Sequence, residues 1–290
     1  MQEKYIFYAD RIVSVEHPYI DDAFVLRHHK SIGEEESKKL VSIYKDLMIR
    51  NRLLAGILSY AAKHNTISHV HCVDIGVFMG SFSNAISLLS RHMDIPIQIN
   101  AYEANPSLIY PLIKNFTIYD SEVLLHWNAV GAERRSMELV VAEAGAIGGS
   151  LANPNERKKG SHYSYIVDTL PLSECLPDTQ DICFIKIDIE GHEVAAFSSI
   201  YNNSAMLNNI FVIEFSPCQA SQEIVPGVLY SDFLFYSFQV YNIGNWGWFQ
   251  QAVSVNTADE LLNIDLLNSG SNTDLLLIPK DIHIDSILSM

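Results

Sequence analysis

Positive charge is scarce in this sequence. Lys and Arg number 19 against 34 Asp and Glu residues, for a formal net charge of −15. A protein that binds nucleic acid or an anionic membrane needs a basic patch to neutralise phosphates, so we expect neither partner. Residues 134–135 and 157–159 are small basic clusters. The second lies among Asn, Pro and Gly residues that indicate a solvated loop, although it could select an anionic acceptor.

Paired cysteines and long apolar runs are also missing. Cys72, Cys175, Cys183 and Cys218 form no CxxC motif, and two of them fall in predicted strands, which is typical of buried reduced thiols in an intracellular protein. Charged residues interrupt the N-terminal segment MQEKYIFYADRIV, so no secretory signal is expected, and no stretch resembles a membrane span. We expect a cytoplasmic protein with no membrane partner.

Apolar residues, in contrast, are plentiful and fall in alternating strand-like and helix-like segments. They make up 48% of the 290 residues, enough for a sizeable core. Short apolar runs predict strands at residues 69–75, 97–101, 123–125, 182–187 and 209–215, with helical patterns between them. This alternation predicts an α/β domain with a mostly parallel sheet, and the closing strand segments predict an antiparallel edge.

The chain divides into two predicted parts before the first of these strands. Residues 67–290 form the predicted cofactor-binding domain. Residues 1–66 are predicted to hold two short strands or an extended arm, then a long amphipathic helix over residues 31–63 that packs on the core or covers its pocket. Later in the chain, the polar and glycine-rich residues 145–162 predict a long binding loop.

The stretch HVHCVDIGVFMGSFS, residues 69–83, predicts a strand, a glycine loop and a helix, the usual cradle of a nucleotide-like cofactor. Its glycines, Gly76 and Gly80, lack the GxGxxG spacing that admits a pyrophosphate, and Asp74 at the strand's end would repel one. A carboxylate here suits a cationic ligand, such as the ammonium and sulfonium of S-adenosylmethionine. The alternative is a simple tight turn with Asp74 as the helix cap.

A second carboxylate ends the next predicted strand. Glu103 is placed to accept both hydroxyls of a ribose, because a carboxylate offers acceptors only, and Ala104 and Asn105 follow it in the same loop. Glu103 could instead cap the following helix. Asn128 and Ala129 come after the third predicted strand and are placed to meet an adenine ring, although Asn128 is also a common turn residue.

Four titratable side chains crowd the end of the strand predicted at residues 182–187. They are Asp188, Glu190, His192 and Glu193. Carboxylates near an imidazole shift one another's pKa values and can supply a base near neutral pH. The alternative for the two glutamates is a cap and the acidic first turn of a helix. The strand aims Asp188 at the same edge as Asp74 and Glu103.

Glu214 lies near the end of the strand predicted at residues 209–215. Burial of a carboxylate is costly, so we expect Glu214 to have a partner, a ligand or solvent. A divalent metal between Asp188 and Glu214 is chemically reasonable, since carboxylate oxygens suit a hard cation, but no ligand motif requires one and none is predicted. Asp188 and His192 are the first candidates for a general base, with Glu190 and Glu214 next.

Taken in order, VDIGVFMGS, AYEANP, IKIDIEGHE and VIEFSP resemble the FkbM-type family of S-adenosylmethionine-dependent methyltransferases over residues 69–217. The segment IKIDIEG is the most specific of these motifs. The resemblance implies a class I methyltransferase (Rossmann-like) fold, with a mostly parallel seven-stranded sheet, an antiparallel last strand and helices on both faces. It also implies methylation of a hydroxyl on a sugar, a polyketide or another small metabolite.

The same resemblance assigns roles to residues. Asp74, Gly76 and Gly80 hold the methionine part, Glu103 holds the ribose, and Asp188 lines the reaction site. The full set of expected cofactor contacts is Asp74, Gly76, Phe78, Gly80, Ser83, Glu103, Ala104, Asn105, Asn128, Ala129 and Asp188. One departure is the glycine loop, where residues 77–79 are Val, Phe and Met instead of smaller and more polar residues.

Two other functions stay open from the sequence. A nicotinamide-dependent oxidoreductase is disfavoured by the missing GxGxxG and by Asp74. A non-catalytic protein that retains the fold is a second alternative, because fold does not imply function, but the intact Asp74, Glu103 and Asp188 argue against it. The expected partner is a small hydroxylated acceptor, and the oligomeric state, including a homo-oligomer, is open.

Overall fold

The computed structural model describes ten segments of the chain. They are residues 4–8, 11–15, 52–78, 80–118, 121–141, 150–151, 163–215, 224–244, 252–262 and 273–289. Two predicted features lie partly or mostly outside them: the first part of the helix expected over 31–63 and most of the loop expected over 145–162. Within the described segments, no helix is long and apolar enough to span a bilayer.

The main sheet has eight strands in the order β5–β4–β3–β10–β11–β16–β14–β15. Their bounds are β3 (Val70–Ile75), β4 (Ile97–Tyr102), β5 (Val123–His126), β10 (Phe184–Ile187), β11 (Ile210–Phe215), β14 (Phe238–Gly244), β15 (Val253–Val255) and β16 (Thr273–Pro279). Strands β5, β4, β3, β10 and β11 are parallel, whereas β16 is antiparallel to both of its neighbours. This topology confirms the predicted class I α/β fold.

Two details of the sheet differ from the prediction. The sheet has eight strands instead of seven, because β15 adds an antiparallel edge beside β14. The last strand, β16, lies between β11 and β14 and not at the edge. The reason is its run Leu275, Leu276, Leu277 and Ile278, which is fully buried and needs cover on both faces.

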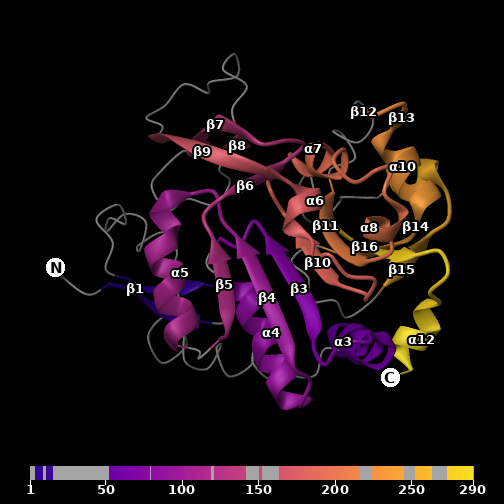
Figure 1. Ribbon diagram of the computed structural model, residues 1–290, viewed down its shortest axis with the longest axis horizontal. Helices are drawn as coiled ribbons and strands as arrows, with labels where there is room; N and C mark the ends of the chain where they lie inside the picture. Colours follow the sequence, from indigo (N-terminus) through magenta and orange to yellow (C-terminus); the bar gives the residue numbers. More distant parts are fainter. Residues whose placement is uncertain are drawn as a thin grey trace.

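Helices pack on both faces of this sheet (Figure 1). They are α3 (Arg52–His64), α4 (Ser81–His92), α5 (Pro106–Ile118), α6 (Leu172–Cys175), α7 (Glu193–Phe197), α8 (Ser204–Leu207), α10 (Tyr230–Ser237), α11 (Ala258–Leu262) and α12 (Ile284–Leu288). Strand β3 shows why two cores form. Val70 and Cys72 pack with Ile57 of α3, while Val73 and Ile75 belong to the cluster on the other face. The described end of the predicted N-terminal helix, α3, is therefore part of the core.

A second, four-stranded sheet lies over the upper ends of β3, β4 and β5 in Figure 1. It has the order β6–β9–β7–β8, with β6 (Ala129–Gly131), β7 (Arg135–Val141), β8 (Ser150–Leu151) and β9 (Tyr163–Pro171). The sequence analysis did not predict a second, separate sheet. Two short antiparallel pairs complete the described strands: β1 (Lys4–Tyr8) with β2 (Arg11–Val15), and β12 (Ile224–Val225) with β13 (Val228–Leu229). Two short strands were one of the two alternatives that the sequence left open for the first pair.

Candidate active site

Three of the predicted carboxylates lie at the carboxyl ends of adjacent parallel strands. Asp74 is near the end of β3, Glu103 follows β4, and Asp188 follows β10. Two backbone hydrogen bonds join these ends: the Asp188 amide donates to the Ile75 carbonyl at 3.0 Å, and the Gly76 amide donates to the Tyr102 carbonyl at 3.0 Å. The crevice at this edge is where open α/β sheets bind their ligands.

The glycine loop is held against β10 so closely that its first glycine cannot carry a side chain. A Cβ atom on Gly76 would lie 1.7 Å from the Asp188 carbonyl oxygen, and the residue has a φ of +79°. Gly80 has a φ of +81°, and a Cβ there would lie 2.7 Å from the Phe116 ring. Both positions favour glycine by conformation as well as by space. Gly76 therefore allows the close approach of β3 to the Asp188 loop, and Gly80 allows the close approach of the glycine loop to α5.

Asp74 is fully buried and already has partners in the protein. Its Oδ2 accepts a hydrogen bond from the Ser83 hydroxyl at 2.6 Å, and its Oδ1 lies 3.8 Å from the Lys186 ammonium. Burial raises the pKa of Asp74, while Lys186 and Ser83 lower it. Asp74 also bonds to the Ser83 backbone in the first turn of α4. The helix-capping alternative thus describes part of its role.

Lys186 is the site residue that the sequence analysis missed. Its Nζ lies 3.1 Å from the Gly76 carbonyl oxygen and 3.2 Å from Oδ2 of Asp188, besides its contact with Asp74. Burial by itself lowers the pKa of this ammonium, but Asp188 and Asp74 raise it by more, so Lys186 stays charged. The signal in the sequence was a lysine inside the apolar run ICFIKIDI.

Glu103 links the glycine loop to the end of β4. Its two oxygens accept hydrogen bonds from the Phe78 amide at 2.8 Å and from the Asn105 amide at 2.7 Å. Phe78 takes up the left-handed region, with a φ of +51°. Burial raises the pKa of Glu103 to about 7. The cap of α5 is Asn105, whose Oδ1 accepts from the amide and the hydroxyl of Ser107, and not Glu103.

Asn128 and Ala129, expected beside an adenine, connect the two sheets. The Asn128 amide donates to the Asp168 carbonyl of β9 at 3.4 Å, and Ala129 is buried in the core of the second sheet. Their contact with a ligand stays a prediction. The exposed side chain here is the preceding Trp127, whose Nε1 donates to the carbonyl of Ala104 at 3.2 Å.

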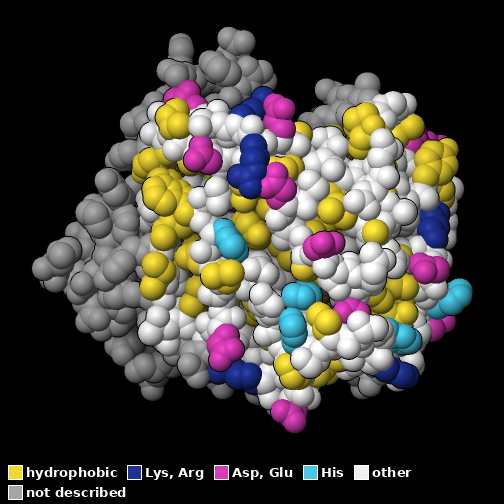
Figure 2. All heavy atoms as spheres, viewed as in Figure 1, with side chains coloured by type: hydrophobic (Ala, Val, Ile, Leu, Met, Phe, Trp, Pro, Cys, Tyr) yellow, Lys and Arg dark blue, Asp and Glu magenta, His cyan; other side chains and the backbone are white. Residues whose placement is uncertain are grey.

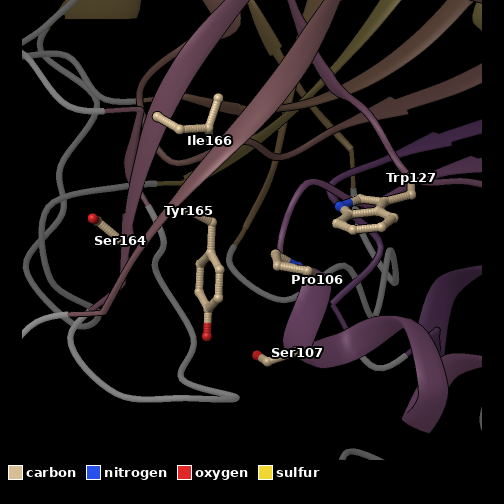
Figure 3. Close-up of a pocket in the computed structure, with 6 residues that line it drawn as sticks. All are labelled: Pro106, Ser107, Trp127, Ser164, Tyr165 and Ile166. Carbon is tan, nitrogen blue, oxygen red and sulfur yellow. The ribbon is translucent and has the colours of Figure 1, made fainter.

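Trp127 borders an open pocket of about 450 Å³ between α5 and β9 (Figure 3). The pocket is lined by Pro106, Ser107, Trp127, Ser164, Tyr165 and Ile166. In Figure 3, Tyr165 extends from β9 toward Ser107, and Pro106 lies between Tyr165 and Trp127. Because Pro106 follows the Glu103 loop and Trp127 follows β5, this pocket continues the same edge of the sheet.

Residues 188–193, the acidic loop after β10, contain both buried structural side chains and accessible ones. Glu193 is buried in the first turn of α7, and its Oε1 accepts the Ile189 amide at 2.9 Å and the Gly191 amide at 3.4 Å. It therefore braces the loop that precedes the helix. Burial raises its pKa to about 7. Glu190 is exposed at a φ of +56°, and burial lowers the pKa of His192.

The side chain of Asp188 is 38% exposed, which leaves it accessible at the end of β10. Glu214 is partly buried on β11, and its register partner on β16 is the acidic Asp274. Among the described residues, no group of three or more His, Cys, Asp or Glu side chains is arranged to hold a metal ion. The described residues therefore offer no third ligand for a metal between Asp188 and Glu214.

Comparisons with solved structures find distant likenesses. A putative class I S-adenosylmethionine-dependent methyltransferase from Listeria monocytogenes has 9% identity and a TM-score of 0.42, over 89% of this chain and 66% of that protein. The plantazolicin methyltransferase BpumL, solved with S-adenosylhomocysteine (SAH), has 8% identity and a TM-score of 0.36, over 85% of this chain and 91% of that one. No curated protein matches.

The family is shown by the sequence itself. A family model described as the methyltransferase FkbM domain matches residues 74–225, just over half of the chain. The match begins at Asp74, near the end of β3, and includes Glu103, Lys186, Asp188 and Glu214. The chain therefore belongs to the FkbM family of S-adenosylmethionine-dependent methyltransferases, as its motifs predicted.

Proposed function

We propose that this protein transfers the methyl group of S-adenosylmethionine to a hydroxyl group of a sugar or another small metabolite. The observation that carries the proposal is the convergence of Asp74, Glu103 and Asp188 on one edge of the sheet, around a loop whose two glycines have no room for a side chain. The first two carboxylates are placed for the cofactor and the third for the acceptor.

The residues present fit this cofactor. Each Glu103 oxygen accepts one backbone amide and keeps a second lone pair, so the ionised carboxylate can also accept ribose hydroxyls. Asp74 and Asp188 together carry one more charge than Lys186 balances, which favours a cationic ligand. When bound, S-adenosylmethionine supplies a methyl group on a positively charged sulfur.

Asp188 is the best-placed base for the acceptor. Lys186 holds its Oδ2 at 3.2 Å and so orients the carboxylate, which leaves Oδ1 to accept the acceptor's proton. As the hydroxyl oxygen bonds to the methyl carbon, the carbon–sulfur bond breaks with its electron pair on sulfur, and the hydroxyl proton passes to Asp188. Positioning of the acceptor in line with that bond supplies much of the rate.

A small, neutral or weakly charged acceptor is the partner that we propose. On the face shown in Figure 2, the Lys and Arg side chains lie singly or beside acidic ones and form no broad basic surface. The negative net charge of the chain points the same way, because it repels phosphate-rich polymers.

Calorimetry with SAH and with NAD tests the cofactor and the oxidoreductase alternative together. We expect SAH to bind and NAD to give no heat of binding. The methyl acceptor is then sought by incubating the protein with S-adenosylmethionine and a panel of hydroxylated metabolites and looking by mass spectrometry for methyl gain. NAD binding without SAH binding would refute the proposal.

The fluorescence of Trp127 should report the binding of the cofactor. Its exposed indole lies beside Ala104, next to Glu103, so we expect SAH to change the tryptophan fluorescence of the protein. Trp127→Phe should remove that change and keep most of the affinity, because an aromatic face remains. Trp127→Ala should weaken binding by about fivefold, in line with about 1 kcal/mol for a stacked ring. An unchanged response in Trp127→Phe would show that another tryptophan reports binding.

Glu190 holds a strained backbone in the loop that carries Asp188. A non-glycine residue at a φ of +56° costs about 1 kcal/mol, and such strain collects at functional sites. We expect Glu190→Gly to raise the free energy of unfolding by up to about 1 kcal/mol and to lower turnover, because the loop becomes less fixed. Glu190→Ala, which keeps the strain, separates the side chain's contribution. Equal turnover in all three proteins would leave the strain without a catalytic role.

A further inference from the structure

Lys186 occupies a position where a charged residue is unusual. Its neighbours on β10, Phe184, Ile185 and Ile187, are fully buried, and the Lys186 side chain is itself only 17% exposed. In the parallel register, Lys186 lies directly opposite Asp74 of β3. Burial of an ammonium group is costly unless it is paired and hydrogen-bonded, so its partners explain why it is there.

Three groups of the protein surround the ammonium, two of them within hydrogen-bond distance and one at ion-pair distance. One partner is the carbonyl of Gly76 at 3.1 Å, the second is Oδ2 of Asp188 at 3.2 Å, and the third is Oδ1 of Asp74 at 3.8 Å. The ammonium therefore joins the end of β3, the glycine loop and the end of β10. Because Asp188 and Asp74 maintain its charge, Lys186 is not suited to act as a base.

We propose that Lys186 is a positioning residue, whose ammonium group fixes the Asp188 carboxylate against the glycine loop and reduces the charge of the Asp74 and Asp188 pair from −2 to −1. The catalytic meaning of this role rests on the proposed function; its electrostatic part does not. With a sulfonium bound, the net charge of Asp74, Asp188, Lys186 and the sulfur is zero. After methyl transfer the sulfur is neutral and Asp188 holds the acceptor's proton, so the net charge of these four groups is again zero.

A balanced charge before and after methyl transfer matters because Asp74 and Lys186 are largely removed from water. A site without Lys186 would hold two carboxylates close together, and one of them would take up a proton and lose its function. The charged groups that act on Lys186 or its partners come from strands β3 and β16 and from the loops after β4 and β10. They are Asp74 of β3, Glu103 after β4, Asp188, Glu190 and Glu193 after β10, and Asp274 of β16.

The test uses the cofactor-free protein and compares Lys186→Met with Lys186→Arg. Lys186 lowers the pKa of Asp74, so its removal raises that pKa further. A carboxyl group with a raised folded-state pKa favours folding at low pH, and this contribution is lost as the pH rises. We therefore expect the unfolding constant of Lys186→Met, relative to wild type, to grow by about tenfold or more from pH 5 to pH 8, as for a pKa change of about one unit.

Urea unfolding at several pH values measures this ratio. Glu193 cancels from it because every variant keeps that residue, whereas Lys186 also lowers the pKa of Glu103, so its removal adds a pH dependence of the same sign there. Lys186→Arg should remove the pH dependence, and the exposed Lys63→Met should show none. If Lys186→Met does not fold, the double variant Asp74→Asn/Lys186→Met should recover folding. A pH-independent loss, or a double variant no more stable than Lys186→Met, would overturn the electrostatic role.

Calorimetry and kinetics then test the catalytic part. We expect Lys186→Met to shift the acidic limb of the pH–rate profile to higher pH and to lower kcat by more than it changes the KM for S-adenosylmethionine, with Lys186→Arg partly restoring both. An unmoved acidic limb would reject positioning of the base. Failure of the wild-type protein to bind SAH would instead refute the proposed function and leave the unfolding result intact.

Discussion

Asp188→Asn should lower turnover by about 10²- to 10⁴-fold, the usual contribution of a base within hydrogen-bond reach. The amide has nearly the same shape and cannot take the acceptor's proton. Because the side chain is 38% exposed, the substitution should leave folding and SAH affinity close to wild type. The measurement is methyl transfer by mass on an acceptor found in the screen, with SAH calorimetry beside it.

The matched control for this variant is Asp178→Asn, which changes an exposed aspartate shortly before β10 and should have no effect. Near-normal turnover in Asp188→Asn would place the base elsewhere. His192 is then the first candidate, because burial lowers its pKa and leaves a neutral imidazole at pH 7. In that case His192→Ala would change the acidic limb of the pH–rate profile, and Glu190 and Glu214 would follow as candidates.

Glu103→Gln should weaken SAH binding by roughly tenfold to a hundredfold at pH 8. The carboxylate accepts two backbone amides and is placed to accept ribose hydroxyls, and hydrogen bonds to a charged group contribute about 1.5 to 3 kcal/mol. Isothermal calorimetry measures the loss. The control is Glu122→Gln, an exposed glutamate just before β5, which should bind SAH like the wild type.

The affinity of the wild-type protein for SAH should also depend on pH. The pKa of Glu103 is about 7 in the folded protein, so below that pH a protonated carboxyl group cannot accept both hydroxyls. Affinity should therefore fall as the pH drops from 8 to 6, and this dependence should be absent in Glu103→Gln. An affinity that is flat with pH in both proteins would remove Glu103 from the ribose site.

The same pKa has the opposite effect on stability. Glu103 takes up a proton at a higher pH in the folded protein than its ordinary value of 4.5, so its contribution favours folding at low pH and is lost as the pH rises through about 7. Glu193 adds a contribution of the same sign over the same range. The ligand-free protein is thus expected to lose stability from these two groups just where cofactor binding becomes strongest.

The sequence by itself determined the class of fold and the edge of the sheet where the chemistry lies. Strand, loop and helix signals are local, and parallel strands joined by helices bring their carboxyl ends to one edge, so Asp74, Glu103 and Asp188 could be placed together without a structure. The motifs around them, which the family model covers from residue 74 to 225, also identified the family.

Only the tertiary structure decided which of these groups have partners. Lys186 is two residues before Asp188 in the chain, but its pairing with Asp74 depends on the register of β10 against β3, which no local pattern encodes. The separate sheet of β6 to β9 and the interior place of β16 were likewise decided by pairing between distant segments. Charges along a sequence show which groups exist, whereas strand pairing determines which of them neutralise each other and which stay available for a ligand.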